Sequence, residues 1–215
     1  MNGIQRCFLI FFLMTYLLIG CNSPYTSKKR GYFKIDLPKR EYVSFNKENF
    51  PFSFDYPAYA QIIRDSSYFD STSDNPYWFN IYFPLFNSKI YMSYKTIGGK
   101  SIYKIKKGSS YSDSVGYNSY EKMVGDAYKL TFKNDVKAYS IEDSVMRTPN
   151  NVTGIFFRVS GNVATAKQFF LTDSTRHFLR GALYFDVTPN EDSLKPVNEF
   201  IQEDMKHIIN TLKWK

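Results

Sequence analysis

The pattern of apolar and polar residues is most regular in the C-terminal part of the chain, where it predicts two strands and a long helix. Residues 168–171 form a short apolar run, residues 172–176 a polar turn, and residues 177–187 a second run. In the second run apolar side chains share one face at a period of two, as in a strand that buries that face. The residues on it are Leu179, Leu183, Phe185 and Val187.

A long amphipathic helix is predicted to follow this strand. Its apolar residues are three or four positions apart, which places them on one helix face. They are Leu194, Val197, Ile201, Met205, Ile208 and Leu212. Ser193 is a suitable N-cap, and it would put Pro196 in the first turn, where a missing N–H costs nothing. We expect the strand and the helix to share one core.

Shorter strands and a second helix are predicted in the preceding chain. The strands cover residues 50–56, continuing through 59–64 after Pro57, and then 77–83, 89–97, 137–146 and 152–160. Residues 65–75 are predicted to be a surface loop, 98–108 a basic link and 119–132 a helix. This order predicts an α+β fold, with an antiparallel β-sheet packed by two main helices. It also resembles the PsbP/Mog1-like α/β/α sandwich.

The first 20 residues have the pattern of a secretory signal peptide. One cation, Arg6, precedes an apolar run over residues 7–19. That run is shorter than the ~20 residues that a membrane-spanning helix needs, and it matches the apolar region of a signal peptide.

The apolar run ends in Leu18, Ile19, Gly20 and Cys21, which resemble the lipobox of bacterial lipoproteins. The resemblance implies that diacylglycerol is attached to the Cys21 thiol, that the chain is cut after Gly20, and that the new amino group is acylated. Several acyl chains would hold the protein on a membrane.

Lipidation at Cys21 would place the protein in the bacterial cell envelope. Residues 1–20 are then a lipoprotein signal peptide, residues 21–31 a lipidated flexible tether, and residues 32–215 a single globular α+β domain. Asn22 replaces the Asp that resembles an inner-membrane retention signal, and no acidic cluster of the surface-export type follows. We therefore expect the domain to face the periplasm, from either the inner or the outer membrane.

The composition is that of a basic globular protein without thiol chemistry. The formal net charge is +8, and removal of Arg6 with residues 1–20 leaves 8 − 1 = +7. The two cysteines are Cys7, in the signal peptide, and Cys21, so the folded part can form no disulfide and no cysteine-ligated site. The positive charge suits an anionic wall polymer, whereas nucleic acid is not expected because no nucleic-acid-binding motif is present.

Candidates for catalysis are few. A Ser-His-Asp hydrolase could use Ser174, His177 and either Asp173 or Asp186, but no G-x-S-x-G motif and no Gly-rich oxyanion loop accompany them. Asp173 and Ser174 are better explained as turn residues. The histidines, His177 and His207, lie in different predicted elements without a metal-binding motif, and no phosphate-binding glycine motif occurs. We expect a protein without enzyme activity, metal or cofactor.

Arg176, His177 and Arg180 are the candidate contacts for an anion or a partner. They lie close together in the sequence, with Arg180 on the strand face opposite Leu179 and Leu183. Three cations in one place could bind a carboxylate or a phosphate. The alternative is an exposed sheet face on which Arg180 pairs with Asp186 or another acid.

Six blocks of sequence resemble the D component of the gliding-motility (Gld) lipoproteins of Bacteroidota. They are GYFKIDLP (31–38), PFSFDYPAYA (51–60), WFNIYFP (78–84), IYMSYK (90–95), QFFLTDSTRHFLRGALYF (168–185) and PNEDSLKPVNEFI (189–201). The resemblance spans nearly the whole chain after Cys21. It implies a cell-envelope lipoprotein required for gliding and for the linked type IX secretion machinery, and it supplies no catalytic residues.

Together, the residues and the resemblance predict a non-enzymatic protein that is held by membrane lipid at Cys21 and binds other gliding and secretion proteins of the envelope. Binding to peptidoglycan or another anionic wall polymer is the first alternative for so basic a domain. An envelope hydrolase that uses Asp173, Ser174 and His177 is the second.

Overall fold

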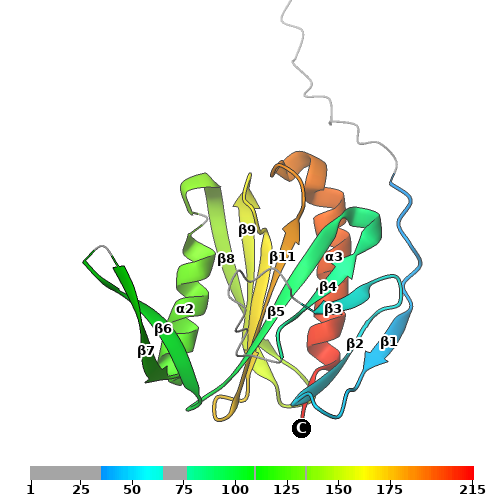
Figure 1. The fold of residues 1–215 in the computed structure, drawn as a ribbon. Helices are drawn as coiled ribbons and strands as arrows, with labels where there is room; N and C mark the ends of the chain where they lie inside the picture. Colours follow the sequence, from blue (N-terminus) through cyan, green and yellow to red (C-terminus); the bar gives the residue numbers. More distant parts are fainter. Residues whose placement is uncertain (1–34, 65–76, 109, 134) are drawn as a thin grey trace, which may run out of the picture. The chain divides into compact units, whose positions relative to one another are not determined.

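The computed structural model describes residues 35–64, 77–108, 110–133 and 135–215. The predicted signal peptide and the tether with Cys21 lie outside the described residues, as does the predicted loop over residues 65–75. Asp36–Lys215 is one compact unit. Its described residues form three antiparallel sheets and two long helices (Figure 1), so the α+β prediction is confirmed.

The largest sheet has seven strands in the order β3-β4-β5-β11-β10-β9-β8. All neighbours in it are antiparallel. The strands are β3 (Gln61–Arg64), β4 (Phe79–Phe83), β5 (Ser88–Thr96), β8 (Ala138–Arg147), β9 (Thr153–Gly161), β10 (Lys167–Thr172) and β11 (His177–Phe185). The central strand β11 pairs with β10, its neighbour in sequence, and with β5 from the first half of the chain.

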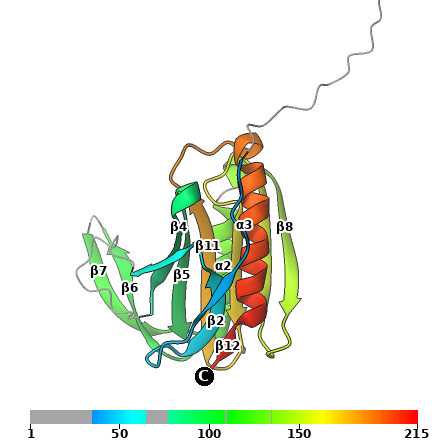
Figure 2. The same ribbon diagram turned by 90° about the vertical axis from the view of Figure 1, so that its right-hand side faces the viewer.

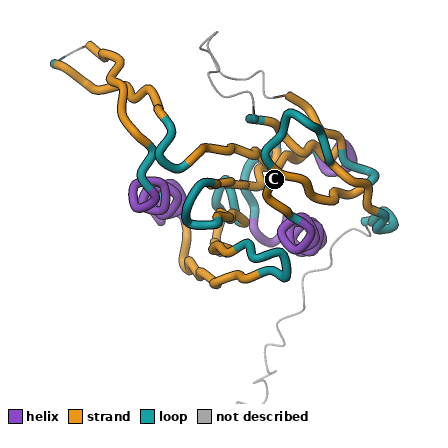
Figure 3. Tube along the Cα trace, turned by 90° about the horizontal axis from the view of Figure 1, so that it is seen from below, coloured by secondary structure: helices purple, strands orange, loops and turns teal. Residues whose placement is uncertain are grey.

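The two long helices lie on opposite faces of this sheet. α3 (Glu191–Thr211) packs on one face, where Ile201, Met205 and Ile208 join the main core (Figure 2). α2 (Tyr120–Phe132) packs on the other face, against Phe157 and Phe170. Figure 3 looks along the two helices, which are seen nearly end-on and apart from each other. The sheet is thus the middle layer between α2 and α3.

A small sheet lies on the α3 side and completes the main core. It consists of β1 (Tyr42–Phe45), β2 (Phe52–Pro57) and β12 (Lys213–Trp214), in the order β1-β2-β12. The buried rings of Phe45 and Phe54 stack on Phe79 of β4, with ring centroids 5.4 and 6.0 Å apart. The many aromatic residues therefore fill the space between the two sheets.

A buried carboxylate fastens β1 to α3. Asp204 accepts hydrogen bonds from the hydroxyl groups of Tyr42, at 2.9 Å, and Tyr59, and the Arg40 Nε lies 3.4 Å from the same carboxylate. Burial raises the pKa of Asp204, although these three contacts act in the opposite direction. Burial and the hydrogen bond to Asp204 raise the pKa of Tyr42 to about 12. The network fixes β1 and the residues before it on the domain.

A β-hairpin replaces the predicted basic link over residues 98–108. Among the described strands, β6 (Lys100–Lys107) and β7 (Ser110–Tyr117) pair only with each other. Gly108 has φ +63°, a conformation that suits the turn between the strands because glycine lacks a Cβ. The prediction was wrong because the Ser-rich sequence of β7 has little of the apolar alternation that identifies a strand.

The sequence predicted that residues 59–64 continue the preceding strand, but in the structure they do not continue β2. The chain turns after Pro57, with the Ala60 N–H donating to the Pro57 carbonyl at 2.9 Å. β3 then enters the seven-stranded sheet beside β4. A turn of this kind is decided by which sheet edge is free, and the local sequence does not contain that information.

The start of α3 also differs from the prediction. The Asn190 side chain is the N-cap and accepts a hydrogen bond from the Ser193 N–H at 3.1 Å. The helix therefore begins at Glu191, and Pro196 lies inside it instead of in its first turn. Asn is as good a cap as Ser, so cap preference alone does not decide between Asn190 and Ser193.

We predict that Leu183→Ala lowers the free energy of unfolding by about 2–5 kcal/mol, because the Leu183 side chain is fully buried between the sheet and α3. Val187→Ala is the control. Val187 was predicted to share the face of Leu183, but it lies beyond the end of β11 and is 51% exposed, so its truncation should change the free energy by no more than about 0.5 kcal/mol. Chemical denaturation measures both, and equal losses would contradict the packing described.

Candidate functional site

A groove of about 670 Å³ lies between α2 and the seven-stranded sheet. α2 covers β9, β10 and the start of β11 through Met123 and Ala127. The parts of β4, β5 and β11 beyond this cover remain accessible within the part of the chain that is described, and they form the floor. We call this the α2 groove.

The sheet contributes an ordered row of side chains to the α2 groove. In β11, Phe178, Arg180, Ala182 and Tyr184 point to this side, whereas the residues between them face α3. The antiparallel register sets Ser93 of β5 directly opposite Arg180. Cross-strand neighbours of this type are close enough for both to contact one ligand.

Aromatic rings lie along the strands of the groove. Trp78 precedes β4, and Tyr91 and Tyr184 form an edge-to-face pair with ring centroids 5.3 Å apart. Tyr184 is 36% exposed, so part of its ring is available to a ligand. Aromatic side chains combine a large contact area with few rotatable bonds, which suits a binding surface.

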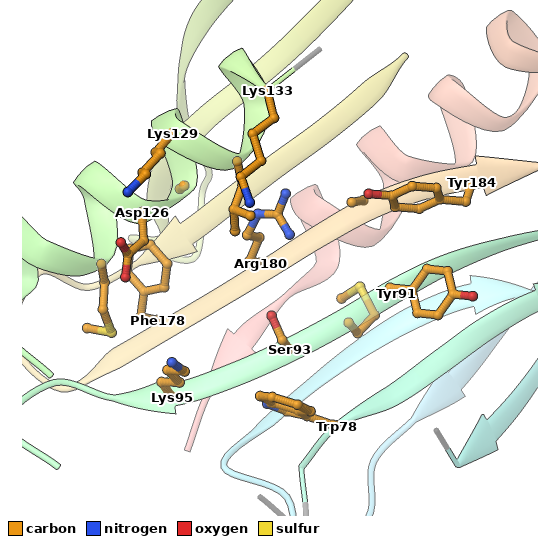
Figure 4. Close-up of a pocket in the computed structure, with 15 residues that line it drawn as sticks. Trp78, Tyr91, Ser93, Lys95, Asp126, Lys129, Lys133, Phe178, Arg180 and Tyr184 are labelled. Atoms are coloured by element: carbon orange, nitrogen blue, oxygen red, sulfur yellow. The ribbon is translucent and has the colours of Figure 1, made fainter. Parts of the chain in front are cut away.

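Four cations and one acid complete the lining. Arg180 and Lys95 come from the sheet, and Lys129, Lys133 and Asp126 come from α2. Figure 4 shows Lys133 and Arg180 extending toward each other from the two sides of the groove. None of these five side chains forms an ion pair within the described residues.

Arg180 is held in place by an amide. Its Nη2 donates to the Oε1 atom of Gln168, which is fully buried in β10. The pKa of Arg180 is lowered by its burial. The predicted alternative was an exposed sheet face on which Arg180 pairs with Asp186 or another acid. In the described residues the guanidinium is instead half-buried in a groove, its hydrogen bond goes to a neutral group, and it forms no ion pair.

His177 lies on the other face of the sheet. It is buried, its Nδ1 is 2.7 Å from the Tyr94 hydroxyl group, and its ring stacks on Trp214 at a centroid distance of 4.9 Å. Burial lowers the pKa of His177. These contacts make the His177 ring part of the packed core beneath β12.

The structure therefore does not bring Arg176, His177 and Arg180 together. Arg176 is exposed in the turn before β11, His177 faces the core, and Arg180 faces the α2 groove. Successive residues of a strand point to opposite faces, which separates His177 from Arg180. Of the three, Arg180 is placed with other cations.

The hydrolase candidates do not assemble either. The Asp173 carboxylate accepts hydrogen bonds from the backbone N–H groups of Thr175, Arg176 and His177, at 3.0, 2.8 and 2.8 Å. Burial alone would raise its pKa, but these bonds lower it overall. Ser174 has φ +64° in the same turn, and Asp186 is exposed beyond the other end of β11. Asp173 and Ser174 are thus turn residues, as their sequence favoured.

No metal site is found in the described ranges, where no three His, Cys, Asp or Glu side chains gather. No helix among these residues is long and apolar enough to cross a membrane.

Sequence reasoning missed most of the α2 groove. Trp78, Lys129 and Lys133 come from distant segments, and nothing in the sequence links them to Arg180. A usable signal was present in β5, where Tyr91, Ser93 and Lys95 alternate with apolar residues and so must share one face.

A family model described as gliding motility lipoprotein GldD matches residues 22–214. The chain belongs to this family. It is accordingly a lipoprotein related to gliding motility, anchored by lipid in the cell envelope. Cys21 immediately precedes the matched residues and lies outside the described ones. No curated protein matches this GldD-family chain.

Among solved structures, the chain is similar to the solution structure of cyanobacterial PsbP (CyanoP) from Synechocystis sp. PCC 6803. The two are 8% identical, the match covers 85% of this chain and 98% of that one, and the TM-score is 0.44. The α+β class of the GldD-family chain rests on its own strands and helices.

We predict that the stability of the wild-type protein falls relative to His177→Phe as the pH is lowered below about 6.5, the usual pKa of histidine. Because burial lowers the pKa of His177 in the folded state, the unfolded chain binds a proton first. The stability contributed by neutral His177 is therefore present above about pH 6.5 and is lost as the pH falls to the folded-state pKa. The slope cannot exceed about 1.4 kcal/mol per pH unit for one proton.

Chemical denaturation of both proteins between pH 7 and pH 5 measures this difference. Phenylalanine keeps a flat ring beside Trp214 and removes the titrating nitrogen atoms. Parallel curves for the two proteins would show that folding does not shift the pKa of His177, and would contradict the prediction.

Proposed function

We propose that this GldD-family chain is a non-enzymatic, lipid-anchored component of the gliding-motility and type IX secretion apparatus. Its domain faces the periplasm and binds other envelope proteins. Membership of the family supports the connection with motility. The resemblance supports the proposed connection with secretion, and the residues after Cys21 support the proposed position in the periplasm.

The α2 groove is the observation that carries this proposal. It combines the partly exposed rings of Trp78 and Tyr184 with cations that have no acidic partner in the described structure. Aromatic and arginine side chains contribute most to the affinity of protein interfaces. Tyr94 and Trp214 surround His177 in the core, and Asp173 is used by the turn, which leaves the hydrolase alternative without an assembled set of groups.

The cations and rings of the groove also favour the alternative of an anionic wall polymer. We prefer a protein partner because the cations are gathered around Arg180 and are flanked by apolar side chains such as Met123, Leu130 and Ala182. A polymer with evenly repeated charges would be matched better by a row of cations.

We predict that Tyr184→Ala reduces colony spreading while the protein stays at its normal level. Removal of an aromatic contact at the centre of an interface costs on the order of 1.4 kcal/mol or more, which weakens binding about tenfold. Tyr184 is partly exposed, so the fold should tolerate the change. Spreading assays with immunoblots of the same cells measure both quantities.

Tyr139→Ala is the matched control for this experiment. Tyr139 is a tyrosine that is 76% exposed, lies in β8, and donates a hydrogen bond to Glu191 on the α3 side. Its loss should leave spreading unchanged. Normal spreading of the Tyr184→Ala strain at an equal protein level would exclude the groove as the functional surface.

We also predict that Cys21→Ala yields a protein without acyl chains that leaves the membrane fraction. One acyl chain gives only marginal membrane binding and several give stable anchoring, so the loss of all of them should shift the protein to the aqueous phase of a detergent partition. Cys7→Ala, within the signal peptide, is the control and should keep the anchor. Intact-mass measurement that finds acyl chains on the Cys21→Ala protein would place the anchor elsewhere.

A further inference from the structure

Arg180 is a half-buried charge that no acidic side chain neutralises within the described residues. The guanidinium lies between α2 and the sheet, and its hydrogen bond goes to the neutral amide of Gln168. Among the described residues no carboxylate pairs with it. Removing a charge from water without a counterion is costly, and a group held in this way inside a cleft is a candidate for a functional site. Its burial lowers the pKa of Arg180, which agrees with a charge that lacks a partner.

The surroundings of Arg180 increase this positive charge. Lys133 extends toward it from α2 (Figure 4), and Lys95 and Lys129 also line the groove. Asp126 is the one acid among the described lining residues, so these side chains carry 4 − 1 = 3 positive charges. A cleft with walls of low dielectric constant focuses such a field. An anion is therefore the expected ligand at this point.

The walls on both sides of Arg180 are apolar. α2 contributes Met123, Ala127 and Leu130, and β11 contributes Phe178 and Ala182. These side chains offer nothing to a free inorganic ion, but they would bury an apolar group attached to the anion. The volume of about 670 Å³ lies within the range of sites that enclose most of a small ligand.

We propose that the α2 groove binds an acidic segment of a protein partner, with a carboxylate on Arg180 and Lys133 and an adjacent apolar side chain between α2 and Phe178. This inference rests on the proposed function and specifies the chemistry of the partner. The planar guanidinium can donate two parallel hydrogen bonds to a carboxylate. Ser93, directly opposite Arg180 in the sheet, can donate a further hydrogen bond from its hydroxyl group.

A purely structural role for Arg180 makes a different prediction. If the guanidinium served only to hold Gln168, its replacement would lower stability and leave binding unaffected in the molecules that remain folded. If it serves a ligand, Arg180→Gln should retain the folded protein and lose the ligand. Arg180→Lys keeps the charge without the planar pair of donors and should recover part of the binding.

Photo-crosslinking from the floor of the groove tests the proposal. The chain has no cysteine after Cys21, so Ser93→Cys adds a single thiol beside Arg180. The membranes of cells that produce this full-length variant are labelled with a benzophenone maleimide and irradiated. The peptide crosslinked to the label is then mapped by mass spectrometry. Ser44→Cys, exposed in β1, is the control for non-specific attachment.

The expected result is an adduct from residue 93, and not from residue 44, to a protein segment that contains Asp or Glu beside an apolar residue. Arg180→Gln should reduce its yield at least tenfold. Arg176→Gln, which removes one exposed positive charge in the turn before β11, should not change it.

A synthetic peptide with the mapped sequence then tests the role of its charge. In a Trp214→Phe background Trp78 is the single tryptophan, and its fluorescence reports on binding in the groove. The peptide should bind at least tenfold more tightly than its twin with Asn and Gln in place of Asp and Glu, and more tightly than inorganic phosphate.

Other outcomes overturn the inference in distinguishable ways. An adduct to glycan identifies a wall-polymer site, and an adduct to phospholipid identifies a headgroup site. A neutral peptide, or a yield that Arg180→Gln does not alter, leaves a partner-binding groove but excludes the carboxylate. Absence of any adduct excludes the acidic segment. If Tyr184→Ala cells also spread normally, the proposed function fails with it.

Discussion

The two faces of β11 lie in different environments, and the rest of the structure depends on this. Leu179 and Leu183 are buried against α3, while Arg180 and Tyr184 on the alternate positions face the α2 groove. Because β11 is the central strand, its pairing with β5 and β10 joins the two halves of the sheet. A shift of the strand by one residue would place Arg180 in the apolar core and the leucines in the groove. The apolar core therefore fixes the register, and the register positions the groove.

The different packing of α2 and α3 follows from the same alternation of side chains along β11. α3 is long, and its apolar face fills the space between the sheet and β2. α2 is shorter and packs on only part of its face of the sheet, through Phe157, Phe170 and Phe178. A helix that covers part of a sheet leaves a concave strip beside it. Within the described residues, the cations that line this strip form no ion pairs. The larger core cluster lies on one face of the sheet, and the cations of the groove lie on the other.

The first described strand is tied to the core in a definite way. Arg40, Tyr42 and Tyr59 gather around Asp204 of α3, so the first described strand is tied to the helix that organises the core. For a member of a lipoprotein family this is a suitable arrangement. The α2 groove lies on the other face of the sheet from this network.

The sequence by itself determined the lipobox-like motif at Cys21, most of the strands, both long helices and the α+β class, because these depend on local periodicity and on short motifs. It also identified Arg180, but grouped it with Arg176 and His177, which lie outside the groove. The hairpin of β6 and β7, the start of α3 at Asn190 and the path of β3 were decided by the tertiary structure, since local preferences were weak or equivalent there. The α2 groove was also decided by the tertiary structure. It forms because β11 pairs with β5 and α2 packs across β10, which brings into one lining Trp78, Ser93, Lys133 and Arg180. Contacts between segments so far apart in the chain have no local signal, and only the packed sheet brings them together.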